Sequence, residues 1–427
     1  MLKAFVNAFK IPDLRKKILF TLCIIATFRL GSHIPVPDVD LNRLADLRNN
    51  LGNQGVVQFI DLFSGGALTQ FAVFSLGIMP YITSSIIMQL LTVVIPRLET
   101  WQKQGEIGIK KITQATRYMT VVLALLQSTG LVFLFHSSQL VQGGVVRIFT
   151  PPRVALIVLT LTAGTAMIMW LGELITQRGI GNGMSILIFT SVISRLPSQG
   201  ATILSQAGAA KFWFFVGLGM LIIFAVVWME QGQRRIPVQY AKRVVGRRMY
   251  GGSSTYIPLK VNQSGVIPII FAASVLYFPS LLVSVYHAQW FANFVNRYVI
   301  NQASPVYMVI YGALVVFFAY FYTAISFNPI DTADNIRKYG GFIPGIRPGA
   351  PTAQYLSNIL NRITLPGSLF LASIALIPSI FLALWQIHAF PFGGTSILIT
   401  VGVALETMKQ LESQLLMRHY EGFLRSP

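Results

Sequence analysis

The chain has 427 residues, of which 54% are hydrophobic and 11% are charged, against roughly 25% charged residues in ordinary soluble domains. So few charged side chains do not cover the core of a water-soluble protein of this length, which excludes soluble enzymes, disordered scaffolds and coiled coils. The single cysteine, Cys23, excludes an intrachain disulfide and a multi-cysteine metal or redox site. The formal net charge of +19 fits nucleic-acid binding or membrane topology, and its distribution decides between them.

Apolar stretches long enough to cross a bilayer recur along the chain, since a spanning helix needs about 20 largely apolar residues. The eight stretches that qualify are 18–36, 73–95, 118–136, 154–173, 212–229, 264–286, 305–327 and 365–387. Two further segments are ambiguous by themselves. Segment 184–197 is short, and segment 393–416 begins apolar and then acquires charged residues at helical spacing.

The distribution of basic residues resolves both ambiguous segments. If all ten segments span and the N-terminus is cytoplasmic, the inside segments hold 25 of the 33 Lys and Arg residues. Without a span at 184–197, the basic segment 230–262 would face outward, against the preference of Lys and Arg for the cytoplasmic side. We therefore expect ten transmembrane helices with both termini cytoplasmic, and we expect the first to be a retained anchor because no small-residue cleavage site follows it.

The apolar segment 59–71 is too short to cross, so it is either interfacial or re-entrant. From the residues alone, the interfacial alternative is favoured by roughly two to one, because re-entrant segments are confined to protein-lined sites.

The string Gly77-Ile78-Met79-Pro80 is weakly repeated later in the chain as Gly265-Val266-Ile267-Pro268. Each string falls on the second expected helix of a half, which predicts an N-terminal half 1–205 and a C-terminal half 206–427. Five spans in each half would make the two an inverted repeat.

The sequence carries no motif of an intramembrane enzyme. It has neither a His-Glu-x-x-His zinc motif nor a Gly-x-x-x-x-Gly-Lys-Ser/Thr phosphate loop. We expect no catalytic residues, no metal and no cofactor. An ion-coupled transporter is the serious rival. Proton coupling is disfavoured because the spans hold almost no ionisable side chains, whereas sodium coupling through backbone carbonyls stays open.

Two long, basic cytoplasmic loops, 230–262 and 328–364, have ordered-looking Gly/Pro turns. Topology and attraction to anionic lipid explain their charge. Their length is better explained by a docking surface for a large cytoplasmic partner, and the residues alone leave the two explanations nearly even.

Several strings together resemble the bacterial SecY family, whose members form the channel of the Sec protein translocon. They are Phe63-Ser64-Gly65-Gly66-Ala67-Leu68, Gly77-Ile78-Met79-Pro80-Tyr81-Ile82, Arg178-Gly179-Ile180-Gly181-Asn182-Gly183, Tyr240-Ala241-Lys242-Arg243 and Gly345-Ile346-Arg347-Pro348-Gly349. The resemblance runs from about Leu14 to about Glu421, with the strings in the order that the family has.

The resemblance implies an all-α polytopic fold of two inverted five-helix halves around a central hourglass pore, which opens sideways between helices 2–3 and 7–8. It implies an apolar pore ring made by Ile78, Ile82, Ile188, Ile270 and Ile399. Ile78 and Ile82 are four residues apart and share a helical face. Apolar constrictions stop hydrated ions by dewetting.

The resemblance also assigns three further sets of residues. It makes segment 59–71 the plug, which reverses the interfacial interpretation; its named residues are Phe59, Leu62, Phe63, Ser64, Gly65, Gly66, Ala67 and Leu68. The lateral gate would be bridged by Gln89 and Asn262, although bonds to neighbouring backbone are an equal alternative. The residues that would bind the motor ATPase SecA or the ribosome are Arg243, Arg247 and Arg347.

The expected function is a protein-conducting channel, not itself an enzyme, in the bacterial cytoplasmic membrane. It would pass unfolded polypeptides across and release apolar segments sideways into lipid. The implied partners are SecE, SecG, SecA, the ribosome, preproteins with their signal peptides, and anionic lipids. The alternative is a sodium-coupled secondary transporter with inverted repeats.

Overall fold

The computed structural model of the protein describes residues 9, 11–39, 61, 63–137, 150–240, 243–245, 248–250, 254–285, 289–301, 304–385 and 394–424. Its helices are α2 (Pro12–Gly31), α5 (Met79–Val94), α6 (Pro96–Lys103), α7 (Glu106–Ser137), α8 (Pro151–Arg178), α9 (Gly183–Gln231), α10 (Ile267–Val285), α11 (Gln289–Val295), the π-helix η1 (Asn296–Ile300), α12 (Pro305–Ser326), α13 (Pro329–Lys338), α14 (Ala350–Trp385) and α15 (Gly394–Leu424). Its strands are β1 (Gln233–Tyr240), β2 (Arg243–Val245), β3 (Arg248–Tyr250), β4 (Ser254–Lys260) and β5 (Gly341–Phe342).

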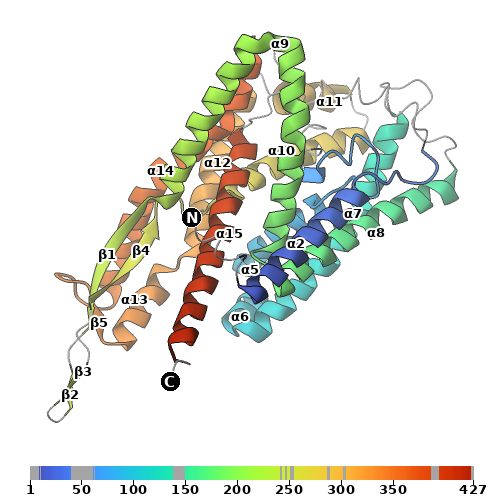
Figure 1. Ribbon diagram of the computed structural model, residues 1–427. Helices are drawn as coiled ribbons and strands as arrows, with labels where there is room; N and C mark the ends of the chain where they lie inside the picture. Colours follow the sequence, from blue (N-terminus) through green and yellow to red (C-terminus); the bar gives the residue numbers. More distant parts are fainter. Residues whose placement is uncertain are drawn as a thin grey trace.

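Each of the ten predicted spans overlaps a helix: α2, α5, α7, α8, the two arms of α9, α10, α12, α14 and α15. Figure 1 shows α9 as a hairpin at one end of the bundle and the β1–β4 sheet with α13 toward the other. The reversal of α9 falls at Gly208, whose φ of +81° is left-handed. Among the described residues, five helices are long and apolar enough to cross a membrane, or six if the bent pair α5 and α6 counts as one. The ten crossings and cytoplasmic termini stay predictions.

Two boundaries differ from the sequence expectation. The predicted span 73–95 becomes helical only at Met79, because the chain turns through Gly77 at a left-handed φ of +55°. Its other end bends by 100° into α6, where Pro96 sits at the start of the new helix and its ring fixes φ.

The loop 230–262 is a small antiparallel sheet rather than irregular chain. β1 pairs with β4 in the register Ile236↔Ile257 and with β5 through Gln239↔Phe342, so the strand order is β4-β1-β5. Ile236 and Val238 alternate with exposed neighbours and are buried, the period of two that puts alternate side chains on one face. β2 and β3 form a separate two-stranded ribbon.

The two repeated strings also share a backbone conformation. Gly77 has φ +55° and Gly265 has φ +61°, and each precedes a helix whose second residue is proline, Pro80 in α5 and Pro268 in α10. The same turn therefore introduces the second helix of each predicted half. This likeness supports the division into 1–205 and 206–427, which stays a prediction.

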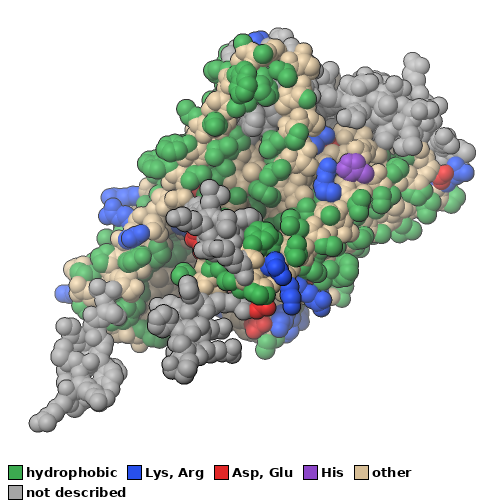
Figure 2. Space-filling view, in the orientation of Figure 1, with side chains coloured by type: hydrophobic (Ala, Val, Ile, Leu, Met, Phe, Trp, Pro, Cys, Tyr) green, Lys and Arg blue, Asp and Glu red, His purple; other side chains and the backbone are tan. Residues whose placement is uncertain are grey.

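Two apolar clusters form most of the interior. One joins α2, residues 63–79, α8 and the first arm of α9 with one residue of α10 and two of α15. The other joins the second arm of α9 with α10, α12, α14 and α15. Figure 2 shows hydrophobic side chains along the flanks of the long helices, and groups of Lys and Arg near β1 and near α6. An apolar exterior of this kind suits contact with lipid.

Candidate functional site

The five predicted ring isoleucines lie in one place. Ile78 precedes α5 and Ile82 lies one turn into it, where the Ile82 amide donates to the Ile78 carbonyl at 3.1 Å. α9, α10 and α15 supply one residue each. Ile78, Ile188, Ile270 and Ile399 are buried members of one apolar cluster, and Ile82 packs against it partly buried. Ile270 and Ile399 come from the predicted C-terminal half and the other three from the predicted N-terminal half.

An arrangement of isoleucines can close an opening without binding what passes through it. Their side chains have no hydrogen-bonding group, and a narrow apolar opening excludes hydrated ions by dewetting. β-branched side chains are also stiff at χ1, which keeps such an opening defined.

Some of the predicted plug residues that the structure describes are members of this cluster. Phe63 and Ala67 belong to the same cluster as the isoleucines, and Phe63, Ser64, Ala67 and Leu68 are at most 1% exposed. Gly65 and Gly66 adopt left-handed φ angles of +65° and +94°, which glycine reaches without steric cost. Phe59 and Leu62 lie outside the described residues. The segment is thus enclosed by protein, which agrees with the re-entrant interpretation and not with the interfacial one.

Sequence reasoning missed the polar contacts of this segment. Asp61 forms an ion pair with Arg195 of α9. Nη1 of Arg29 in α2 donates to the Gly65 carbonyl at 2.9 Å and to Oγ of Ser194 at 3.0 Å. The sequence signal for these contacts is the rarity of charged residues within the predicted spans. Arg29 and Arg195 are two such residues, each after an apolar run, and charged residues within spans are usually paired.

The two predicted gate residues are not bonded to each other. Nδ2 of Asn262 donates to Oε1 of Glu230 at 2.6 Å and to the Gly265 carbonyl at 3.1 Å. Gln89 lies half-buried on α5. Asn262 lines a polar pocket of about 430 Å³ with Glu230 and Lys409. α10 contacts both α5 and α7, the helices at which the lateral opening is predicted.

The three predicted docking cations are described unequally. Arg347 is exposed in the turn between β5 and α14, and its carbonyl accepts from Oγ1 of Thr352 at 2.8 Å. Arg243 begins β2, paired with Tyr250, and Arg247 lies outside the described residues.

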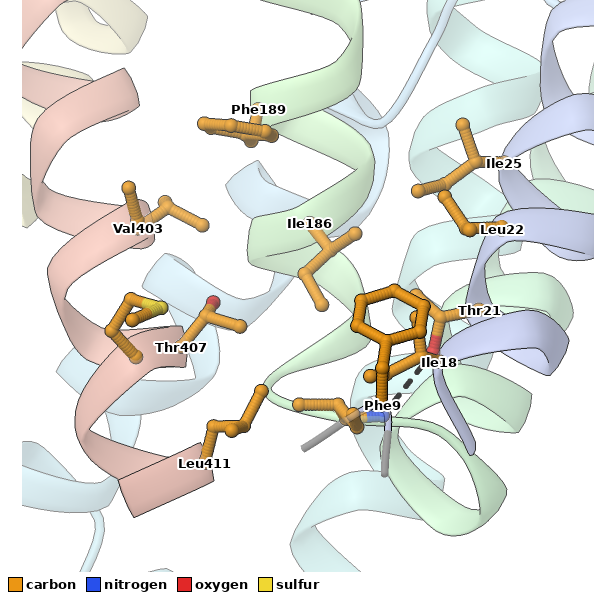
Figure 3. Close-up of a pocket in the computed structure, with 13 residues that line it drawn as sticks. Phe9, Ile18, Thr21, Leu22, Ile25, Ile186, Phe189, Val403, Thr407 and Leu411 are labelled. Carbon is orange, nitrogen blue, oxygen red and sulfur yellow. Dashed lines mark hydrogen bonds between the residues drawn. The ribbon is translucent and has the colours of Figure 1, made fainter. Parts of the chain in front are cut away.

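A second, apolar cavity of about 290 Å³ lies beside the isoleucine cluster. Figure 3 shows Leu22 and Ile25 of α2 on one side, Val403 of α15 on the other, and Ile186 and Phe189 of α9 between them. At its wall the Ile180 amide donates to Thr21 Oγ1 at 3.2 Å, which ties α2 to the chain before α9.

These features define a class: a polytopic helical membrane protein in which isoleucines of several helices and a buried segment before α5 pack in one apolar cluster. The SecY family model matches residues 72–408. The protein translocase subunit SecY of Streptomyces coelicolor is 57% identical over 438 residues, which cover 100% of both chains. The chain belongs to the SecY family.

Solved structures agree on the fold. A SecY structure, described as showing that the plug domain stabilises the closed state of the translocation channel and maintains a membrane seal, has a TM-score of 0.61 at 18% identity, covering 95% of this chain and 96% of that one. Sec61 in the canine ribosome-channel complex from the endoplasmic reticulum has a TM-score of 0.58 at 17% identity, with the same coverage.

The family confirms the resemblance found in the sequence. The protein is a multi-pass membrane protein and a protein-conducting channel subunit, not itself an enzyme. The alternative of a sodium-coupled transporter is therefore set aside.

Proposed function

We propose that this chain forms the pore through which unfolded polypeptides cross the bacterial cytoplasmic membrane, with Ile78, Ile82, Ile188, Ile270 and Ile399 as its constriction. The single observation that carries the assignment of the ring is the meeting of these side chains, from four helices, in one buried cluster. The function itself follows from the family.

The proposed ring seals the resting pore and yields to a moving chain. A polypeptide extended at about 3.3–3.6 Å per residue fills the opening as it passes. Because isoleucine side chains offer no hydrogen bond, the passing chain is not held by the ring. The segment with Phe63 and Leu68 is the plug, which adds a second barrier over the ring; a plug that maintains a membrane seal is described for the SecY neighbour.

The sideways release of apolar segments uses the contact of α10 with α5 and α7. When these helices separate, a segment of the passing chain meets lipid. A central Leu, Ile, Phe or Val then gains roughly 0.3–0.6 kcal/mol, whereas a central Asp, Lys or Arg costs about 2.5–3.5 kcal/mol. Gln89 lies on α5 and Asn262 in the segment before α10, and Asn262 acts through Glu230 rather than through Gln89.

The driving force comes from partners. SecA or the ribosome docks on the sheet of β1, β4 and β5 and on the turn with Arg347, while Arg243 and Arg247 add fixed cations that fork onto carboxylate or phosphate. The ribosome-bound Sec61 neighbour supports docking of a ribosome. SecE and SecG complete the complex, and anionic lipids attract the basic loops.

Reconstitution tests this function. Vesicles that contain this chain with a SecE-like subunit should import a preprotein, in the presence of SecA and ATP, to a protease-protected state. A small solute accumulated under a sodium gradient, with no protected preprotein, would contradict the proposal.

A further inference from the structure

The plug segment is fastened to its surroundings by charge. The Asp61 carboxylate is 1% exposed, and its Oδ2 pairs with Nη2 of Arg195. A buried carboxylate is tolerated only when it is paired and hydrogen-bonded. Its other oxygen, Oδ1, accepts from the Thr69 amide at 3.3 Å and from Ser64 Oγ at 3.4 Å. Both Oδ1 donors belong to the segment itself, whereas Arg195 links this carboxylate to α9.

A second contact that holds the segment is made at Gly65, four residues after Asp61. Arg29 Nη1 donates to the Gly65 carbonyl at 2.9 Å, and Ser194 Oγ lies 3.4 Å from the same oxygen. The backbone of Gly65 lies directly on α9, since a Cβ built on it would lie 3.1 Å from the Ser191 Cα. The left-handed φ and this close approach both require glycine here. α2 and α9 therefore hold the segment from two sides.

The fastening and the proposed ring share one helix face. Ile188, Ser191 and Arg195 follow one another at intervals of three and four residues in α9, a spacing that places side chains on the same face. A displacement of this arm of α9 that withdraws Ile188 from the ring also withdraws Arg195 from Asp61. Widening of the ring and release of the segment are thereby coupled.

We propose that Arg195 and Arg29 are positioning residues that latch the plug segment against the proposed ring, Arg195 through Asp61 and Arg29 through the Gly65 carbonyl. The inference rests on the proposed function, because it takes the segment to be the plug. In the latched state the carboxylate is buried against its guanidinium. In the released state water hydrates the carboxylate in place of the guanidinium. The Arg195 and Arg29 contacts are then lost together.

The test measures the position of the segment directly. Ala67 is fully buried, so Ala67→Cys in a Cys23→Ser background should react slowly with a membrane-impermeant maleimide added from the outer side. Asp61→Asn and Arg195→Gln should each raise the labelling rate by about tenfold, because breaking a buried pair from one side is strongly unfavourable. Arg29→Gln should raise it by a smaller factor, because it loses a hydrogen bond to a neutral acceptor.

A second ion pair supplies the matched control. Arg117 donates Nε and Nη2 to the Glu173 carboxylate at 2.6 and 2.7 Å, between α7 and α8 and away from the segment. Arg117→Gln should leave the labelling rate within about twofold of the parent. The charge exchange Asp61→Arg with Arg195→Asp should bring the rate back toward the parent. If Asp61 and Arg195 only stabilised the fold and did not hold the segment, exchanging their charges would not restore the parental labelling rate.

The outcomes separate the two proposals. If Asp61→Asn and Arg195→Gln leave labelling at the parental rate while preprotein import proceeds, the latch is wrong and the proposed function stands. If the labelling rates rise as stated but the parent protein imports no preprotein, the fastening is real and the proposed function fails.

Discussion

The isoleucines of the proposed ring and the segment proposed as the plug pack in one apolar cluster, yet different forces hold them. The isoleucines contribute only apolar side chains to this cluster. The segment is fastened by the Asp61–Arg195 ion pair and by the Arg29 contact with the Gly65 carbonyl. A barrier built from apolar surface depends on side-chain size, whereas a fastening built from a buried ion pair depends on the presence of both partners.

This difference assigns the two barriers separate tasks. Under the proposed function, the ring opens and closes around a moving chain at each residue, because no bond is broken when its side chains part. The proposed plug changes state once for each opening, because its ion pair is either buried and intact or separated and hydrated. Substitutions that alter size should therefore disturb the ring, and substitutions that alter charge should disturb the segment.

The largest expected effect comes from emptying the ring. Replacing Ile78, Ile188, Ile270 and Ile399 together with glycine should raise the ion conductance of the resting channel by orders of magnitude, because the opening is no longer narrow and dry. Single-channel recordings in planar bilayers measure it. Glycine at Leu126 and Leu159, which are 65% and 61% exposed on α7 and α8, is the control and should leave the bilayer tight. A tight bilayer with the emptied ring would refute the assignment.

A charge reversal distant from both barriers should separate transport from sealing. Arg347→Glu should lower SecA-driven preprotein import by about tenfold or more, because a fixed cation that forks onto an anionic partner becomes repulsive. The resting conductance should stay at the parental level. Import at the normal rate into vesicles that carry this variant would show that Arg347 is not a docking residue.

The repeated turn before α5 and α10 offers a matched pair of substitutions. Gly77→Ala puts a Cβ 2.7 Å from the Phe63 carbonyl, whereas at Gly265 nothing lies within 4 Å. Both glycines are left-handed, so each alanine costs about 1–2 kcal/mol of backbone strain. Only Gly77→Ala should also displace the plug segment and raise the resting ion leak by several-fold. Equal leak from both variants, measured in dye-loaded vesicles, would show that strain alone is responsible.

The smallest expected effect concerns the gate residues. A double-mutant cycle between Asn262→Ala and Glu230→Ala should give a coupling energy of about 1 kcal/mol in thermal unfolding in detergent, because the two side chains share a hydrogen bond. The cycle between Asn262→Ala and Gln89→Ala should give none. Coupling in the second cycle alone would restore the bridge between Gln89 and Asn262.

The sequence predicted the helices well because the apolar runs needed for a membrane are long and local. It placed all ten apolar segments on helices, and the spacing of Ile78 and Ile82 put both on one face. The meeting of Ile188, Ile270 and Ile399 was expected only from the family resemblance, since nothing local distinguishes them from lipid-facing isoleucines. The small sheet of β1, β4 and β5 was not predicted, because its pairing depends on residues in two separate loops.

The latch was beyond sequence reasoning for a related reason. Asp61 and Arg195 are 134 positions apart, and their pairing depends on how segment 61–77 packs against α9. The charges themselves were visible as exceptions at the ends of apolar runs. Their partners followed only from the three-dimensional arrangement.

Cross-linking from a translocating chain tests the central claim most directly. Each ring isoleucine is replaced in turn by cysteine in a Cys23→Ser background, and a preprotein with one cysteine is arrested in mid-passage. The account predicts disulfide cross-links from the arrested chain to all five ring positions and none to cysteine at Leu126 or Phe224, which are 65% and 75% exposed on the helix bundle. Cross-links to the exposed positions, with none to the five isoleucines, would contradict it.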